Sequence, residues 1–155
     1  MSTDKQSIED VLRDKGFVVI STAGYSMAPM LRDRKDTVEI HAPTKSPRKY
    51  DVVLFRKSDR LVLHRIIKVT GNGYIIRGDN AIEKDEVRPE DIIGVLFAFT
   101  RNGKRYTATD ISYRIYSRFS VFYHPLKITI QRTKGRIKRF IIRKKGRTKQ
   151  TMSRR

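Results

Sequence analysis

The feature that most constrains the fold is a series of short apolar runs separated by turn-forming residues. The runs are rich in β-branched and aromatic side chains, which favour strands over helices. They cover residues 17–20, 37–40, 52–55, 61–69, 74–76 and 92–99. Gly, Pro, Asp and Asn stand between them, as in the segments GNG (71–73) and GDN (78–80), and these residues are typical of tight turns. We therefore expect a mainly β domain.

Helical patterns flank this region on both sides. Residues 3–15 have apolar side chains at helical spacing, with Thr3 or Ser7 as the candidate N-cap and Gly16 as the stop. Beyond Asp110, apolar residues again recur three or four positions apart, which indicates an amphipathic helix. These residues are Ile111, Ile115, Phe119 and Phe122. Leu126, Ile128 and Ile130 then alternate with polar residues as in a strand.

The net charge divides the chain near residue 100. The whole sequence carries +19, from 35 Lys and Arg against 16 Asp and Glu. Residues 101–155 hold 18 basic side chains and one acidic side chain, a net charge of +17, which leaves +2 for residues 1–100. The sequence therefore predicts an N-terminal helix within residues 1–16, a nearly neutral β-rich domain over 17–100, and a basic extension over 101–155 that is partly amphipathic helix and partly disordered.

Composition excludes several classes of chemistry and of membrane protein. The chain has no cysteine, so disulfides, thiolate zinc sites and cysteine nucleophiles are excluded. Residues 92–99 form the longest apolar run, eight residues, against about 18 for a membrane span. The polar N-terminus lacks the apolar centre of a secretory signal. We expect a protein of the cytoplasm or of the inner face of the membrane.

Few residues could act as nucleophile or base. Ser26 lies in the segment GYSMAPM after the first expected strand, where a serine more often closes a turn, and a serine nucleophile requires a positioned base. His64 lies inside a strand-like run, where a structural role is common, yet its near-neutral pKa makes it the best candidate base. His41 and His124 lie near prolines and fit exposed loops.

Two aspartates follow His64 along the chain. Asp79 is the centre of the GDN segment and Asp85 comes six positions later. A turn role explains Asp79 on composition alone. A carboxylate can also orient a catalytic histidine and stabilise the imidazolium that forms during reaction, so both aspartates are candidate partners of His64.

The order of these segments resembles that of the signal peptidase I family. The matching segments are GYSMAPML (24–31), YDVVLFR (50–56), LHRI (63–66), GDN (78–80) with Asp85, and IIGV (92–95). The family shares a β-rich fold with the self-cleaving LexA-type repressors. The resemblance implies a mainly β, signal peptidase/LexA-like catalytic domain with a short N-terminal helix and a basic C-terminal extension.

The resemblance also implies a role for each candidate residue. The family has a Ser/Lys branch and a Ser/His branch, and His64 matches the second. By this resemblance Ser26 is the nucleophile, His64 the general base, Asp85 the residue that orients His64, and Asp79 a supporting residue. No cofactor or metal is required by this scheme. Gly24 stands where many members have Ser, so the oxyanion hole would depend on backbone N–H groups, including that of Ser26.

The function implied is a serine endopeptidase that cleaves a signal peptide, leader peptide or precursor protein through an acyl-enzyme. A second interpretation stays open, in which the chain is a non-catalytic basic protein that binds nucleic acid or a membrane surface. Besides the peptide substrate, we expect contact between the basic extension and anionic membrane. Nucleic acid is the weaker candidate, because no helix-turn-helix, zinc or RNP-type signature accompanies the charge.

Overall fold

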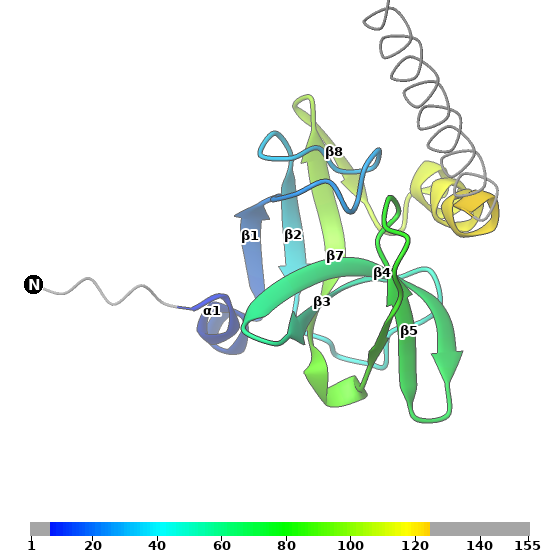
Figure 1. Ribbon diagram of the computed structural model, residues 1–155. Coiled ribbons are helices and arrows are strands. Elements are labelled where there is room, and N and C mark those ends of the chain that lie inside the picture. The colour runs from blue at the N-terminus through cyan, green and yellow to red at the C-terminus, as the bar shows by residue number, and fades with distance from the viewer. Residues whose placement is uncertain (1–6, 125–155) are drawn as a thin grey trace, which may run out of the picture. The chain divides into compact units, whose positions relative to one another are not determined.

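The computed structural model describes residues 7–124 and has the expected mainly β architecture (Figure 1). The elements are α1 (Ile8–Lys15), β1 (Phe17–Ser21), β2 (Thr37–His41), β3 (Val52–Lys57), β4 (Arg60–Thr70), β5 (Gly73–Arg77), β6 (Asp85–Val87), the 3-10 turn η1 (Pro89–Asp91), β7 (Ile92–Arg101) and β8 (Lys104–Thr107). Residues 111–124 are also helical. All strand pairs are antiparallel. The sheet has the order β1-β2-β7-β3-β4-β5-β6, with β8 paired to β7, and it curls strongly.

Helix α1 begins and ends where its capping residues predict. Ser7 and Asp10 form a capping box, in which each side chain accepts a hydrogen bond from the other residue's backbone N–H. Gly16 ends the helix with a φ of 76°, and its N–H donates to Leu12 O, because glycine adopts the left-handed conformation without a steric penalty. Ser7 is thus the N-cap of α1, and the predicted turn from Thr3 lies outside the described residues.

Two short strands were not predicted, and one of them extends the sheet past residue 100. β6 (DEV) and β8 (KRYT) are too polar to show the period-2 pattern of a half-buried strand. Each forms through backbone pairing with a neighbour, β6 with β5 and β8 with β7. Asn102 and Gly103 both have positive φ in the β7–β8 turn, as expected for a tight hairpin. The sheet therefore ends at Thr107.

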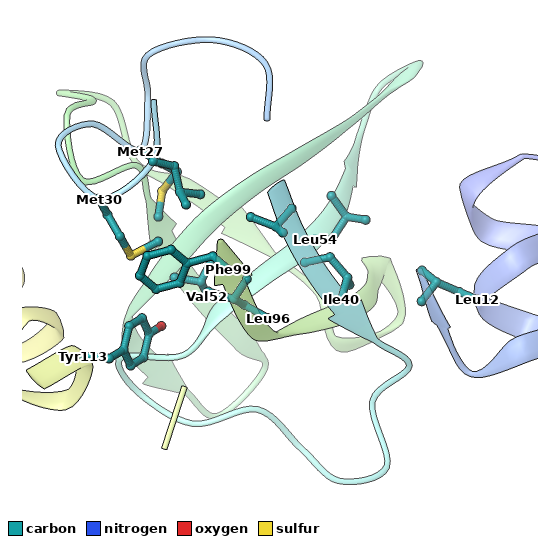
Figure 2. Close-up of a cluster of buried hydrophobic side chains, with 11 residues drawn as sticks. Leu12, Met27, Met30, Ile40, Val52, Leu54, Leu96, Phe99 and Tyr113 are labelled. Atoms are coloured by element: carbon teal, nitrogen blue, oxygen red, sulfur yellow. The ribbon is translucent and has the colours of Figure 1, made fainter. Parts of the chain in front are cut away.

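The core lies on both sides of β3. Val52 and Leu54 belong to one buried cluster, whereas Val53 and Phe55 belong to another, because side chains alternate along a strand. Figure 2 shows the first cluster, which extends from Leu12 of α1 to the loop after β1. In that loop Met27, Met30 and Leu31 are buried. The core thus anchors the loop that carries Ser26.

The two remaining histidines do not lie in the predicted loops. His41 is the last residue of β2, and its ring stacks on Phe97 at a centroid distance of 4.2 Å. His124 is helical. The chain divides into two compact units, Met1–Val121 and Phe122–Arg155, and the site described below belongs to the first. The strand expected over 126–130 and the basic runs beyond residue 132 lie outside the described residues.

Candidate active site

The loop after β1 presents Ser26 between two anchored segments. Gly24, with a φ of 87°, turns the chain after the strand, and its N–H donates to Asp33 Oδ1 at 2.7 Å. Met27 is buried directly after Ser26, whereas the Ser26 side chain is only half-buried. Ser26 is therefore held at the edge of the core, where it lines the cleft described below.

The GDN turn holds the backbone of Ser26. The Asn80 N–H donates to Ser26 O at 2.7 Å, and Asn80 Nδ2 donates to Tyr25 O at 3.2 Å. A Cβ atom at Gly78 would lie 2.5 Å from Ser26 O, a clash with backbone that cannot move aside. Glycine at position 78 therefore allows the turn and the serine loop to approach so closely.

The same geometry brings Ser26 and His64 together. A Cβ atom built on Gly78 would be 3.0 Å from Ser26 Cβ and 3.0 Å from His64 Nε2. The two atoms are therefore separated by no more than twice that distance. Ser26 Oγ is bonded to that Cβ atom, so the hydroxyl group is carried within the same small region as His64 Nε2. The structure thus brings the predicted nucleophile and the predicted base together, although residues 26 and 64 are distant in sequence.

His64 is buried and is kept neutral by its surroundings. Burial lowers its pKa below the ordinary value, and the nearby Asp85 carboxylate only partly offsets this effect. His64 Nδ1 lies 3.5 Å from Asp85 Oδ2, an ion-pair distance beyond hydrogen-bond range, so Nδ1 has no hydrogen-bond partner in the described residues. Neutral His64 can accept a proton at Nε2, and the imidazolium that forms would lie next to the Asp85 carboxylate.

Asp85 also binds a residue that sequence reasoning did not identify. Lys57 Nζ, at the end of β3, forms an ion pair with Asp85 Oδ1. The Lys57 charge contributes to the lowered pKa of His64. Nothing in the local sequence marks Lys57, because its position depends on how β3 pairs with β4 and how β6 pairs with β5. Asp85 is thus shared between Lys57 and His64.

Asp79 faces Arg65 and not His64. Arg65 Nε and Nη2 donate to the two Asp79 oxygens, each at 2.8 Å, and Tyr116 OH donates to Oδ2 at 3.2 Å. Arg65 Nη1 also donates to Tyr50 O at 2.9 Å. Although burial opposes it, the Asp79 hydrogen bonds and charge raise the pKa of Arg65. Asp79 therefore fixes the turn behind the site, and its effect on His64 is long-range.

A cleft of about 690 Å³ opens in front of these residues. Its polar lining includes Ser26, His64, Asp85 and Lys57, together with Arg60 and Glu83. Its apolar walls come from the end of β1, the serine loop and the start of β4. They include Ile20, Met27, Leu31, Leu61, Val62 and Leu63, and Ile8, Val38 and Leu54 line the cleft as well. The site can therefore accept a chain that carries apolar side chains next to the Ser26 hydroxyl.

The Ser26 N–H is a candidate oxyanion donor. It takes part in no hydrogen bond among residues 7–124, whereas the Gly24 N–H is already occupied by Asp33. Across the same residues, no group of three or more His, Asp or Glu side chains is arranged to hold a metal ion. No helix in the described range is both long enough and apolar enough to cross a membrane.

Comparisons with known proteins assign no family to the chain. A scan against protein-family models finds no match, and a search of curated proteins finds no relative.

Proposed function

We propose that the chain is a serine endopeptidase resembling signal peptidase I of the Ser/His type. One observation carries the proposal: Ser26 Cβ and His64 Nε2 both lie 3.0 Å from the Cβ position of Gly78. Asp85 lies behind the far nitrogen of His64, and a cleft lies in front of Ser26. Nucleophile, base and orienting carboxylate thus occur in the order that acyl transfer requires.

The reaction follows from the protonation state of His64. Ser26 Oγ attacks the scissile carbonyl carbon as His64 Nε2 takes the hydroxyl proton, and the carbonyl π electrons move to oxygen. The Ser26 N–H stabilises this oxyanion. The tetrahedral intermediate collapses, the C–N bond breaks, and His64 gives its proton to the leaving amine. Water then attacks the acyl-enzyme with His64 again as base, which releases the carboxylate product and regenerates Ser26.

The cleft suits an extended peptide substrate. Its apolar walls run along β4 and the end of β1, and an extended peptide can bind alongside such strands through backbone hydrogen bonds. By analogy with signal peptidases, small residues are preferred before the cut, and the substrate is a signal peptide, leader peptide or precursor protein. The place of reaction would be the cytoplasm or the inner face of the membrane.

Two tyrosines of the basic region, Tyr106 and Tyr113, make ring contacts inside the protein. Tyr106 of β8 stacks on Phe99 at 5.1 Å, and Tyr113 is buried. Lys104 Nζ also lies over the Tyr106 ring, at 5.4 Å from its centroid. Both rings therefore already have partners within the protein, whereas single-stranded nucleic acid stacks on free aromatic rings. The peptidase interpretation is therefore the better supported one.

The decisive test is covalent labelling combined with peptide cleavage. We expect a serine-directed acylating probe to label the wild-type protein at Ser26 and a peptide library to be cleaved. Ser26→Ala should abolish labelling, and His64→Ala should reduce labelling and cleavage at least about a thousandfold, because members of such a unit act together. Ser112→Ala and His41→Gln, both outside the cleft, should behave as wild type. Equal activity of all five proteins would exclude the mechanism.

A further inference from the structure

The helix over residues 111–121 packs against the body of the protein with the face that carries Tyr113 and Ser117. Ser117 Oγ accepts a hydrogen bond from Arg65 Nη1 at 2.9 Å, and Tyr113 OH accepts another at 3.3 Å. Ser117 and Tyr113 are both buried. Tyr113 is also part of the hydrophobic core. Amphipathic helices of globular proteins usually bury their aliphatic residues as well, and this helix does not.

The apolar side of the same helix faces outward. Ile111 is 75% exposed, Ile115 is 64% exposed and Phe119 is 57% exposed. Residues four positions apart lie on one helix face, so these side chains form a continuous stripe, here called the outer stripe. A contiguous apolar surface of this kind is typical of a binding surface and not of the ordinary exterior of a monomer.

A cationic hollow lies beside the outer stripe. It has a volume of about 280 Å³, and Arg114 and Arg118 of the helix line it together with Arg48 and Lys49 of the loop before β3. The ring of Tyr50 lies between two of these cations, at 5.1 Å from Lys49 Nζ and 5.4 Å from Arg118 Cζ.

The hollow contains one carboxylate, that of Asp51. Its Oδ2 accepts a hydrogen bond from the backbone N–H of Arg48 at 2.7 Å, so one of its two oxygens is already hydrogen-bonded within the loop. Four cationic side chains around one carboxylate leave an excess of positive charge. The lining therefore suits an anion such as a phosphate group, for which Arg offers a planar array of donors.

We propose that this surface docks on an anionic lipid bilayer, with the outer stripe in the headgroup and acyl boundary and the hollow bound to lipid phosphate. Apolar side chains on one helix face next to arginines are the features of an interfacial helix. The arginines can extend their charged ends to the phosphate level while their stems cover apolar surface. Nucleic acid would satisfy the cations but would leave Ile111 and Ile115 exposed. The +17 charge of residues 101–155 adds attraction to an anionic leaflet.

A single-tryptophan reporter tests where the protein inserts, because the chain has no tryptophan. In the full chain, Ile115→Trp should show a shift of emission to shorter wavelength, and quenching by brominated lipid, with phosphatidylglycerol/phosphatidylcholine vesicles but not with phosphatidylcholine alone. Val19→Trp is the matched control, because Val19 is 56% exposed on β1, and its emission should not change. Vesicle binding that leaves the Ile115→Trp emission unchanged would overturn the proposal, because charge alone would then account for binding.

Co-sedimentation separates the two parts of the surface. Ile111→Ser/Ile115→Ser should weaken binding to the anionic vesicles about tenfold or more. Arg114→Gln/Arg118→Gln should weaken it and reduce its salt dependence. The matched controls, Val19→Ser/Ile82→Ser and Arg13→Gln/Arg88→Gln, change exposed residues elsewhere and should bind as wild type, with circular dichroism confirming the fold of each.

Two further outcomes would overturn the proposal. In one, inorganic phosphate or single-stranded RNA changes the Ile115→Trp emission while the vesicles do not. In the other, neutral vesicles bind as tightly as anionic ones.

Discussion

Two adjacent residues of β4 each face an aspartate, and the two pairs are built in opposite ways. Arg65 and Asp79 form a closed pair: both side chains are almost fully buried, and two hydrogen bonds of 2.8 Å join them. His64 and Asp85 form an open pair: their nearest atoms are 3.5 Å apart, His64 Nδ1 lacks a hydrogen-bond partner, and both residues line the cleft. Neighbouring positions on one strand thus serve different purposes.

The difference shows how a fully hydrogen-bonded buried pair, here called the frame, can support a neighbouring site whose protonation state can change. A buried ion pair must be fully hydrogen-bonded, because each unsatisfied charge would be costly. Arg65 meets this requirement and connects β4, the GDN turn and the helix over 111–121. His64 is left incompletely satisfied, which is typical of groups that exchange protons. The closed pair positions the turn that holds Ser26, and the open pair is free to change its protonation state.

The largest expected effect comes from opening the closed pair. Arg65→Met leaves the Asp79 carboxylate buried without its partner and should lower the free energy of unfolding by about 3–5 kcal/mol. Urea denaturation followed by circular dichroism measures this loss. The double variant Arg65→Met/Asp79→Leu removes both charges and should recover part of the stability. An Arg65→Met protein as stable as wild type would show that the Arg65–Asp79 pair does not stabilise the packing of β4 against the GDN turn and the helix.

A smaller loss of stability is expected from a substitution at Gly78, where the GDN turn contacts the backbone of Ser26. Gly78→Ala places a Cβ atom 2.5 Å from Ser26 O, so the serine loop must shift. We expect a loss of stability of about 1–3 kcal/mol and a fall in Ser26 labelling greater than the stability loss explains. Gly71→Ala is the matched control, since its Cβ would meet nothing within 4 Å, and it should change neither quantity measurably. If Gly78→Ala were labelled as strongly as wild type, the close approach of the GDN turn would not be needed for the reactivity of Ser26.

The smallest expected effects are shifts in the titration of the open pair. Burial holds the pKa of His64 below its ordinary value, so the wild-type site should be active at neutral pH and lose activity as the pH falls through that lowered pKa. Lys57→Met removes a cation that lowers the pKa of His64, and it also releases Asp85 from its ion pair. The pKa of His64 should therefore rise, and the loss of activity on acidification should occur at a higher pH. Asp85→Asn removes a carboxylate that raises the pKa of His64, so the loss of activity on acidification should occur at a lower pH.

Titration of the His64 ring protons by NMR measures these shifts without relying on activity. A His64 pKa that shifts in the same direction in both variants would contradict the position of Asp85 between Lys57 and His64.

Sequence patterns located most elements, because strands and caps leave local signals. The runs near 52–55 and 61–69 correspond to β3 and β4, and Ser7 and Gly16 bound α1. β6 and β8 gave no such signal, since their polar sequences form strands only through pairing with a neighbour. For the site, the order of segments suggested Ser26, His64 and both aspartates. Lys57 was missed because it belongs to no local motif. Arg65 lies in the LHRI segment but was given no role, because nothing in the local sequence predicts its burial against Asp79.

Local sequence therefore determined the mainly β character, the position of the turns and the concentration of positive charge after residue 100. Tertiary structure decided which aspartate meets which partner and which side of the helix after residue 110 faces outward. The reason is that these contacts depend on register: β4 pairs with β3 on one side and with β5 on the other, with a shift between Ile66 and Lys68. Alternation along one strand states which side chains share a face, but only the pairing of several strands brings Asp79 to Arg65 and Asp85 to His64.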